Sequence, residues 1–175
     1  MRKTVIIKED QTKNLMPTND WPEYFHPEVN GGIVRLYHGL TMDSLDYVLT
    51  NEEFTPKTCA EGVNGLWFST EGSGDYPSGY QCMVSIDVPE SDISRYYDHP
   101  FKIMNSTHVL AEKSIPLSKY PFKVLKIKGL TLDEETRANL KNLLETKGKQ
   151  YDDFLVVFCE SSAIYYYLKE WILGE

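Results

Sequence analysis

The sequence predicts an α+β fold, and three kinds of observation support that class. Short segments in which apolar and polar residues alternate recur along the chain, as expected for strands with one buried face. Segments that read as capped helices lie between and after them. The chain has 175 residues and is 41% hydrophobic, which suits one globular domain with one core. We therefore expect a single domain over residues 32–175, preceded by an extended lead-in over residues 1–31.

The lead-in is inferred from its prolines. Pro17, Pro22 and Pro27 interrupt any regular element, because proline lacks a backbone N–H and fixes φ. Gly31-Gly32 then marks the turn into the first clear strand.

About seven short strands are expected, over residues 4–7, 33–37, 66–68, 82–88, 107–111, 122–127 and 154–158. Alternation along the second of these places Arg35 on the face of Tyr37 and not on that of His38. The last, Phe154–Phe158, is a continuous apolar run and is interpreted as a buried strand.

Three helices are expected, over residues 41–50, 131–147 and 161–171. Thr41 is the expected N-cap of the first helix, and Ser161 or Ser162 that of the last. The second helix begins with the capping-box pattern of Thr131 and Glu134.

Charge and cysteine content exclude several classes of partner. A formal net charge of -8 without a pronounced basic run makes nucleic-acid binding an unfavoured function. The three cysteines are widely separated and show no CxxC spacing, which favours a reducing compartment and predicts no metal site. The first residues show neither a signal peptide nor a membrane span, so we expect a cytoplasmic protein without a membrane partner.

The most informative stretch is Tyr37-His38-Gly39, read together with Gly65-Leu66-Trp67-Phe68-Ser69. A histidine followed by glycine ends one short strand, and an aromatic pair followed by serine ends another. Glycine lets a flat amide approach the backbone, and aromatic rings can stack on a flat ligand. Taken one at a time, a histidine in a turn or a tryptophan in a core would explain the same residues, so their order along the chain carries the functional hypothesis.

These motifs, with Tyr76 or Tyr80 after them, resemble the core of the ADP-ribosyltransferase fold over residues 33–127. The resemblance is to the histidine-tyrosine branch that includes the poly(ADP-ribose) polymerases, with RNA 2'-phosphotransferases and DNA-modifying ADP-ribosyltransferases as cousins. The opening residues also weakly resemble those of some bacteriophage and gut-bacterial proteins. The resemblance implies a split β-sandwich with a few flanking helices, and NAD as co-substrate without a metal.

The resemblance also implies roles for individual residues. The backbone of Gly39 would hold the nicotinamide carboxamide, and His38 would hydrogen-bond a ribose hydroxyl. Trp67 takes the position where the family has a tyrosine, which keeps a stacking surface. The residues implied in NAD binding are Tyr37, His38, Gly39, Trp67, Ser69, Tyr76 and Tyr80.

The expected catalytic carboxylate is the point where the chain departs from the family. A glutamate on a late strand normally holds the ribose and stabilises positive charge in the transition state. The resemblance places His108 at that position, and Glu112 lies four residues further on, about 13 Å along a straight strand. Either a bulge shifts Glu112 into the site or the family glutamate is absent. The candidate catalytic residues are His38, His108 and Glu112.

The resemblance therefore implies an NAD-dependent mono-ADP-ribosyltransferase that releases nicotinamide, with a protein or nucleic-acid acceptor that the sequence does not identify. The alternative is a catalytically silent module of the same fold that binds a nucleotide or a protein partner. Removal of a 2'-phosphate from RNA is a third hypothesis, which the acidic charge balance disfavours.

Overall fold

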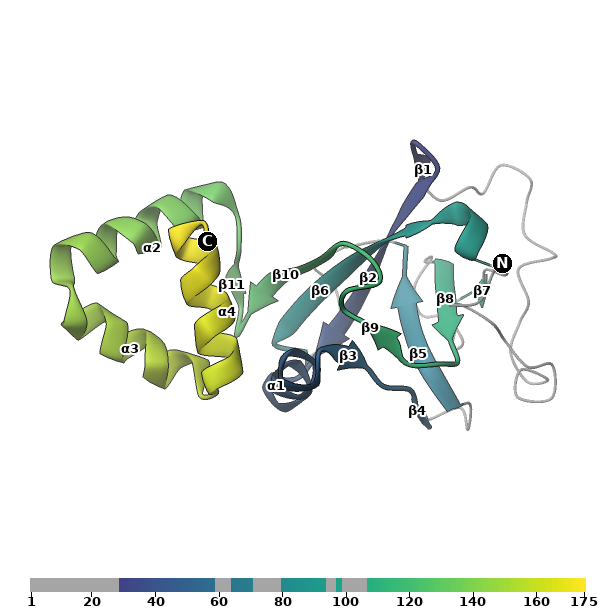
Figure 1. The fold of residues 1–175 in the computed structure, drawn as a ribbon, viewed down its shortest axis with the longest axis horizontal. Helices are drawn as coiled ribbons and strands as arrows, with labels where there is room; N and C mark the ends of the chain where they lie inside the picture. The colour runs from purple at the N-terminus through teal and green to yellow at the C-terminus, as the bar shows by residue number, and fades with distance from the viewer. Residues whose placement is uncertain (1–28, 59–63, 71–79, 94–96, 99–106) are drawn as a thin grey trace. The chain divides into compact units, whose positions relative to one another are not determined.

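The computed structural model describes residues 29–58, 64–70, 80–93, 97–98 and 107–175, and it has the expected α+β class. Figure 1 shows the elements along the chain. The strands are β1 (Val29–Asn30), β2 (Ile33–Leu40), β3 (Glu53–Phe54), β4 (Lys57–Thr58), β5 (Asn64–Ser69), β6 (Cys82–Pro89), β7 (Tyr97–Asp98), β8 (Thr107–Ala111), β9 (Ile115–Pro116), β10 (Phe122–Ile127) and β11 (Leu130–Thr131). The helices are α1 (Met42–Asn51), α2 (Glu134–Lys147), α3 (Lys149–Cys159) and α4 (Ser162–Leu173), with a 3₁₀ turn η3 (Glu90–Asp92).

The chain forms two compact units. Unit 1 comprises Met1–His38, Glu52–Tyr76 and Val84–Lys123, and unit 2 comprises Gly39–Asn51, Pro77–Met83 and Val124–Glu175. Strands β2, β6 and β10 each begin in one unit and end in the other. The expectation of one domain over residues 32–175 remains a prediction.

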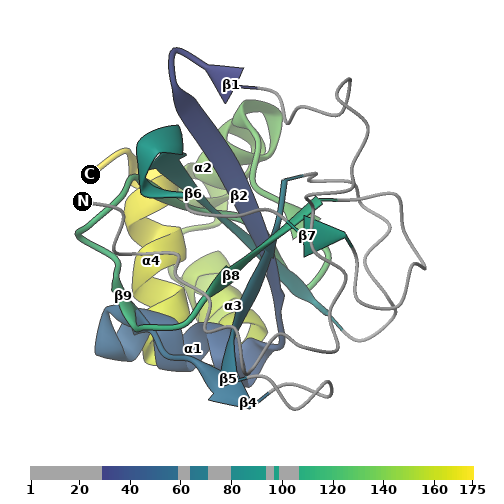
Figure 2. The same ribbon diagram turned by 90° about the vertical axis from the view of Figure 1, so that its right-hand side faces the viewer.

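The sheet of unit 1 places its strands in the order β6-β2-β5-β8-β7. The pairings of β5 with β2, of β5 with β8 and of β8 with β7 are antiparallel. Their registers align Tyr37 of β2, Ser69 of β5 and His108 of β8 in one row across the sheet. Figure 2 shows β5 and β8 side by side. This row joins two of the motifs that the sequence singled out.

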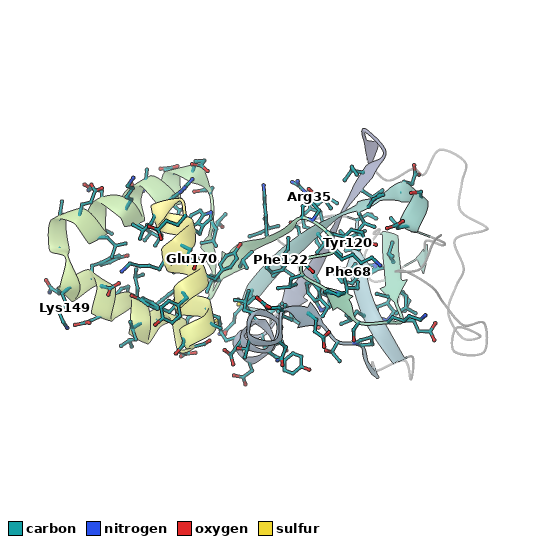
Figure 3. The ribbon with its side chains drawn as sticks, in the orientation of Figure 1. Arg35, Phe68, Tyr120, Phe122, Lys149 and Glu170 are labelled. Carbon is teal, nitrogen blue, oxygen red and sulfur yellow. The ribbon has the colours of Figure 1, made fainter. Side chains whose placement is uncertain are left out.

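The core of unit 1 lies between the sheet and a small second sheet. In that second sheet β3 pairs with β9, and Phe54 lies opposite Ile115. Both side chains are 1% exposed, as is Phe68 of β5. The ring of Phe54 packs edge-to-face against two other rings. The distance between centroids is 5.6 Å to Phe68 and 5.9 Å to Phe122. Phe68 and Phe122 are labelled in Figure 3.

The last residues of the expected lead-in form a hairpin. Val29 pairs with Val34 and Asn30 with Ile33, across Gly31 and Gly32. Both glycines have positive φ, 63° and 75°, which residues with a Cβ rarely adopt. Residues 1–28 of the lead-in, with the short strand expected over residues 4–7, lie outside the described residues.

Unit 2 is largely helical. Helix α4 packs against α1, α2 and α3, and its Ile164, Leu168 and Ile172 are fully buried. Figure 1 shows α2, α3 and α4 in this unit. Every third or fourth residue of α4 therefore faces the core, as an amphipathic helix requires.

The expected helix caps are confirmed at two of three helices. The hydroxyl of Thr41 accepts from Ser44 N–H, and the hydroxyl of Ser161 accepts from Ile164 N–H. The prediction for the third helix, α2, was wrong, because Thr131 belongs to β11. The N-cap of α2 is Asp133, whose side chain accepts from Thr136 N–H. An aspartate immediately before the helix satisfies the same free N–H groups as a capping-box threonine.

The prediction of a strand over Phe154–Phe158 was wrong, because this run lies inside α3. Leu155 and Cys159, four residues apart, are buried, whereas Val157 between them is 74% exposed. A short apolar run has no polar residues to reveal its period, so a buried strand and a helix cannot be told apart in it. An ion pair at helical spacing, Lys149 with Asp153, lies at the start of α3.

No helix in the described part of the chain combines the length and the apolar character that a membrane crossing requires.

Candidate functional site

His38 is fixed in place by its neighbours in unit 1. Its Nδ1 lies 2.7 Å from the carbonyl oxygen of Trp67, and its ring centroid lies 5.2 Å from that of Phe68 and 6.3 Å from that of Phe54. The alternation of β2 continues the buried side of Val34 and Leu36 to His38, so this histidine faces the aromatic core. An imidazole held by a hydrogen bond and two rings has few other rotamers open to it.

The protonation of His38 follows from these contacts. A carbonyl oxygen only accepts, so Nδ1 must carry the proton of this hydrogen bond. Burial lowers the pKa of His38, and the hydrogen bond to Trp67 opposes this only in part. The neutral ring then has an unprotonated Nε2, which is a hydrogen-bond acceptor. His38 is therefore a positioned acceptor at neutral pH.

We predict that the stability of the protein decreases as the pH is lowered, partly through His38. Its folded pKa is lowered, so below the ordinary value of about 6.5 the unfolded chain binds a proton that the folded chain does not. The free energy of unfolding should therefore decrease as the pH drops from about 6.5 towards the folded pKa, by up to about 1.4 kcal/mol per pH unit from this residue. Urea unfolding of wild type and of His38→Asn across this range measures the difference, and parallel pH profiles for the two proteins would contradict it.

A second group of predicted residues lies on the other face of the same strands. Ser69 pairs with Tyr37 on one side and with His108 on the other, and cross-strand partners project to the same face. Trp67, two residues before Ser69, shares that face, and its ring lies 6.2 Å from that of His108 at 74°. Ser69 and His108 are 1% and 7% exposed. The structure thus brings Tyr37, Trp67, Ser69 and His108 together.

The structure does not bring His38 into this second group. Period-two alternation along β2 turns His38 away from the face of Tyr37, and the ring of His38 contacts Phe68, which follows Trp67 on the opposite face of β5. The backbone carbonyl of Trp67 joins the two groups through its hydrogen bond with His38. A single small ring cannot touch both sides of one sheet, so the two groups are two separate sets of contacts.

The position of Glu112 is decided by the register of β5 with β8. The pairs run without interruption from Leu66 with Ala111 to Ser69 with His108, so no bulge lies between these residues. Glu112 follows directly after β8, at the end of the strand away from His108. It is therefore not shifted towards the row of Tyr37 and Ser69, and His108 occupies the position beside Ser69.

In unit 2, Gly39 lies directly against an aromatic ring. A Cβ at this position would be 3.0 Å from Cγ and 3.1 Å from Cδ2 of Tyr80, closer than ordinary van der Waals contact. Tyr80 is 51% exposed. The absence of a side chain at Gly39 is thus what allows the ring to approach the backbone. Tyr76, the other tyrosine that the sequence offered, lies outside the described residues.

We predict that Gly39→Ala destabilises the protein by about 1 kcal/mol, because the new methyl group crowds the Tyr80 ring. The cost is small because a half-exposed ring can move. In the background of Tyr80→Ala, the same substitution should cost less, and urea unfolding of the four proteins of this double-mutant cycle measures the coupling. Equal costs in the two backgrounds would show that the ring does not restrict residue 39.

One polar pair of unit 1 was missed in the sequence. The guanidinium of Arg35 donates from Nε and Nη2 to the two carboxylate oxygens of Asp87, at 2.7 Å and 3.0 Å. The hydrogen bond to Arg35 lowers the pKa of Asp87, and the reciprocal bond raises the pKa of Arg35. The residues are 52 positions apart, and no local signal links them. The pair gives Arg35 a structural partner on the face of Tyr37.

Within the described ranges, no group of three or more His, Cys, Asp or Glu side chains is arranged to hold a metal ion. Comparison of the chain with known proteins finds no matching family model, curated protein or solved structure.

Proposed function

We propose that the chain binds NAD and is a mono-ADP-ribosyltransferase of the split β-sandwich fold. The observation that carries the proposal is the hydrogen bond from His38 Nδ1 to the Trp67 carbonyl oxygen. It fixes the ring and leaves Nε2 as an acceptor for a ribose hydroxyl, which is the role that the resemblance gives to His38. Such a contact would orient the sugar whose glycosidic bond breaks on release of nicotinamide.

The close approach of Tyr80 to Gly39 gives further support. The ring of Tyr80 reaches the backbone of Gly39 because glycine has no side chain. A flat carboxamide would need the same access to the N–H and C=O groups of Gly39. In unit 2, the half-exposed ring of Tyr80 also offers a surface on which a flat ring could stack, worth about 1 kcal/mol.

A second candidate is a catalytically silent NAD-binding module. It is favoured by the uninterrupted register that leaves His108, and not Glu112, beside Ser69. Transfer of ADP-ribose passes through a state with positive charge on the ribose, which a carboxylate stabilises and an imidazole, without a negative charge, does not stabilise in the same way. Under this candidate the chain binds NAD without cleaving it.

Two measurements test both candidates. The melting temperature is recorded with NAD, with ADP-ribose and with nicotinamide alone. A ligand at 100 times its dissociation constant should stabilise the fold by about 2.7 kcal/mol, so an unchanged melting temperature with NAD and with ADP-ribose would contradict both candidates. Incubation with NAD labelled in the adenylate part and in the nicotinamide part then separates them. Labelled protein together with released nicotinamide supports the transferase, and binding without release supports the silent module.

A further inference from the structure

Phe54 reaches His38 from a different sheet than Phe68 does. The register of Tyr37 with Ser69 puts His38 next to Phe68 across the ladder of β2 with β5, so that contact lies within one sheet. Phe54 lies on β3, whose partner strand is β9. Its ring centroid is 6.3 Å from that of His38, and the two ring planes are nearly perpendicular, at 87°. The imidazole is therefore bounded from two directions by two separate sheets.

The second sheet holds Phe54 in place. Phe54 pairs with Ile115 of β9, and both side chains are 1% exposed. The N–H of Leu117, directly after β9, donates to the carbonyl oxygen of Glu52, directly before β3, at 2.9 Å. Glu52 has a φ of 55°, which a residue with a side chain rarely adopts unless the surrounding structure holds it. The backbone pairing of β3 with β9 thus fixes where the ring of Phe54 lies.

The orientation of the His38 ring decides which of its nitrogens accepts a hydrogen bond. Rotation about the Cβ–Cγ bond of histidine is soft, with a broad two-fold profile. In the orientation observed, Nδ1 lies 2.7 Å from the carbonyl oxygen of Trp67 and carries the proton of the neutral ring. A neutral imidazole without a fixed partner populates both tautomers, because the proton follows the hydrogen bond. An edge-to-face contact has a preferred angle, so Phe54 restricts the same rotation.

We propose that Phe54 is the positioning residue of His38, because its ring keeps the imidazole turned towards Trp67 and so keeps Nε2 as the acceptor. Phe54 is 1% exposed, so it acts through His38 and not by touching a ligand itself. The consequence for NAD binding rests on the function proposed above. The tautomer of His38 does not, since it can be measured in the protein without any ligand.

The test measures the protonation of the histidine nitrogens by ¹H–¹⁵N correlation NMR of the full chain without ligand. At about pH 8 a histidine with the ordinary pKa of about 6.5 is neutral. The chain has four histidines, and the signals that His38→Asn lacks are those of His38. Wild type should show one tautomer, with Nδ1 protonated and Nε2 unprotonated. A wild-type ring with Nε2 protonated, or with the two tautomers averaged, would overturn the proposal whatever the variants show.

Phe54→Leu removes the ring and keeps an apolar side chain, so both nitrogen signals of His38 should shift towards the average of the two tautomers. Phe54→Met makes the same test if Phe54→Leu does not fold. The matched control is Leu168→Ala in α4 of unit 2, where a fully buried side chain is also shortened. It should lose stability and leave the His38 signals as in wild type. Unchanged signals in the folded Phe54 variant, or an equal shift in Leu168→Ala, would show that Phe54 does not position the ring.

The affinity for NAD separates a failure of this proposal from a failure of the proposed function. If both hold, calorimetry should show that Phe54→Leu binds NAD about tenfold more weakly than wild type, as expected for the loss of about one hydrogen bond, and that Leu168→Ala binds as wild type does. If wild type does not bind NAD, the proposed function fails and the nitrogen signals still decide the role of Phe54. An unchanged affinity in a variant with a shifted tautomer would contradict the role of Nε2 in binding.

Discussion

His38→Asn is expected to abolish the rise in melting temperature that NAD gives the wild-type protein, while leaving the fold intact. The amide nitrogen of asparagine lies where Nδ1 of histidine lies, so it can still donate to the carbonyl oxygen of Trp67. The substitution removes Nε2, the acceptor that the proposal assigns to the ribose. At an NAD concentration that just saturates wild type, a loss of about tenfold or more in affinity removes most of the thermal shift.

The matched variant for this experiment is His38→Ala, which loses both the acceptor and the hydrogen bond to Trp67. If Nε2 contacts the ligand, both variants lose the shift, and only His38→Ala also loses stability in the absence of NAD. If His38 serves only to hold β5, then His38→Asn should behave as wild type with NAD. A full NAD shift in His38→Asn would therefore remove His38 from the binding site. Isothermal titration calorimetry with NAD gives the affinities directly.

Phe68→Ala is expected to lower the free energy of unfolding by about 3–5 kcal/mol. Phe68 is 1% exposed and its ring contacts both His38 and Phe54, so its removal leaves a cavity in the aromatic core of unit 1. A loss of this size is a large part of the stability of a protein of ordinary size. Urea unfolding followed by circular dichroism measures it.

The control is Phe154→Ala, the same substitution at a ring that is 55% exposed, which should change the free energy of unfolding by about 0.5 kcal/mol or less. A loss below about 1 kcal/mol for Phe68→Ala would mean that the ring is not tightly packed. The hydrogen bond of His38 would then lack one of the two ring contacts that hold its imidazole.

Much of the secondary structure could be predicted because it depends on short-range patterns. The alternation around Arg35 and Tyr37 and the capping residues Thr41 and Ser161 are local, and the structure confirms them. The prediction of a strand over Phe154–Phe158 failed because a continuous run of apolar residues shows neither the period of a strand nor that of a helix. Its exposed side chains on α3 depend on which side of the helix other elements cover, which no local pattern contains.

The residues of the candidate site could be predicted from the sequence, but their arrangement in space could not. The order of the motifs was enough to name His38, Trp67, Ser69 and His108. Their division between two faces of the sheet depends on the register of β2, β5 and β8, which joins residues up to 71 positions apart, from Tyr37 to His108. Register is set by the whole buried face of a sheet, and a shift of one residue would move every side chain of the strand to the opposite face.

The three strands shared by the two units have a consequence for how the protein can be divided. Because β2, β6 and β10 each cross from one unit to the other, neither unit is a continuous piece of the gene product. No single truncation yields either unit, and a cut at Gly39, Val84 or Val124 passes through a strand and not through a loop.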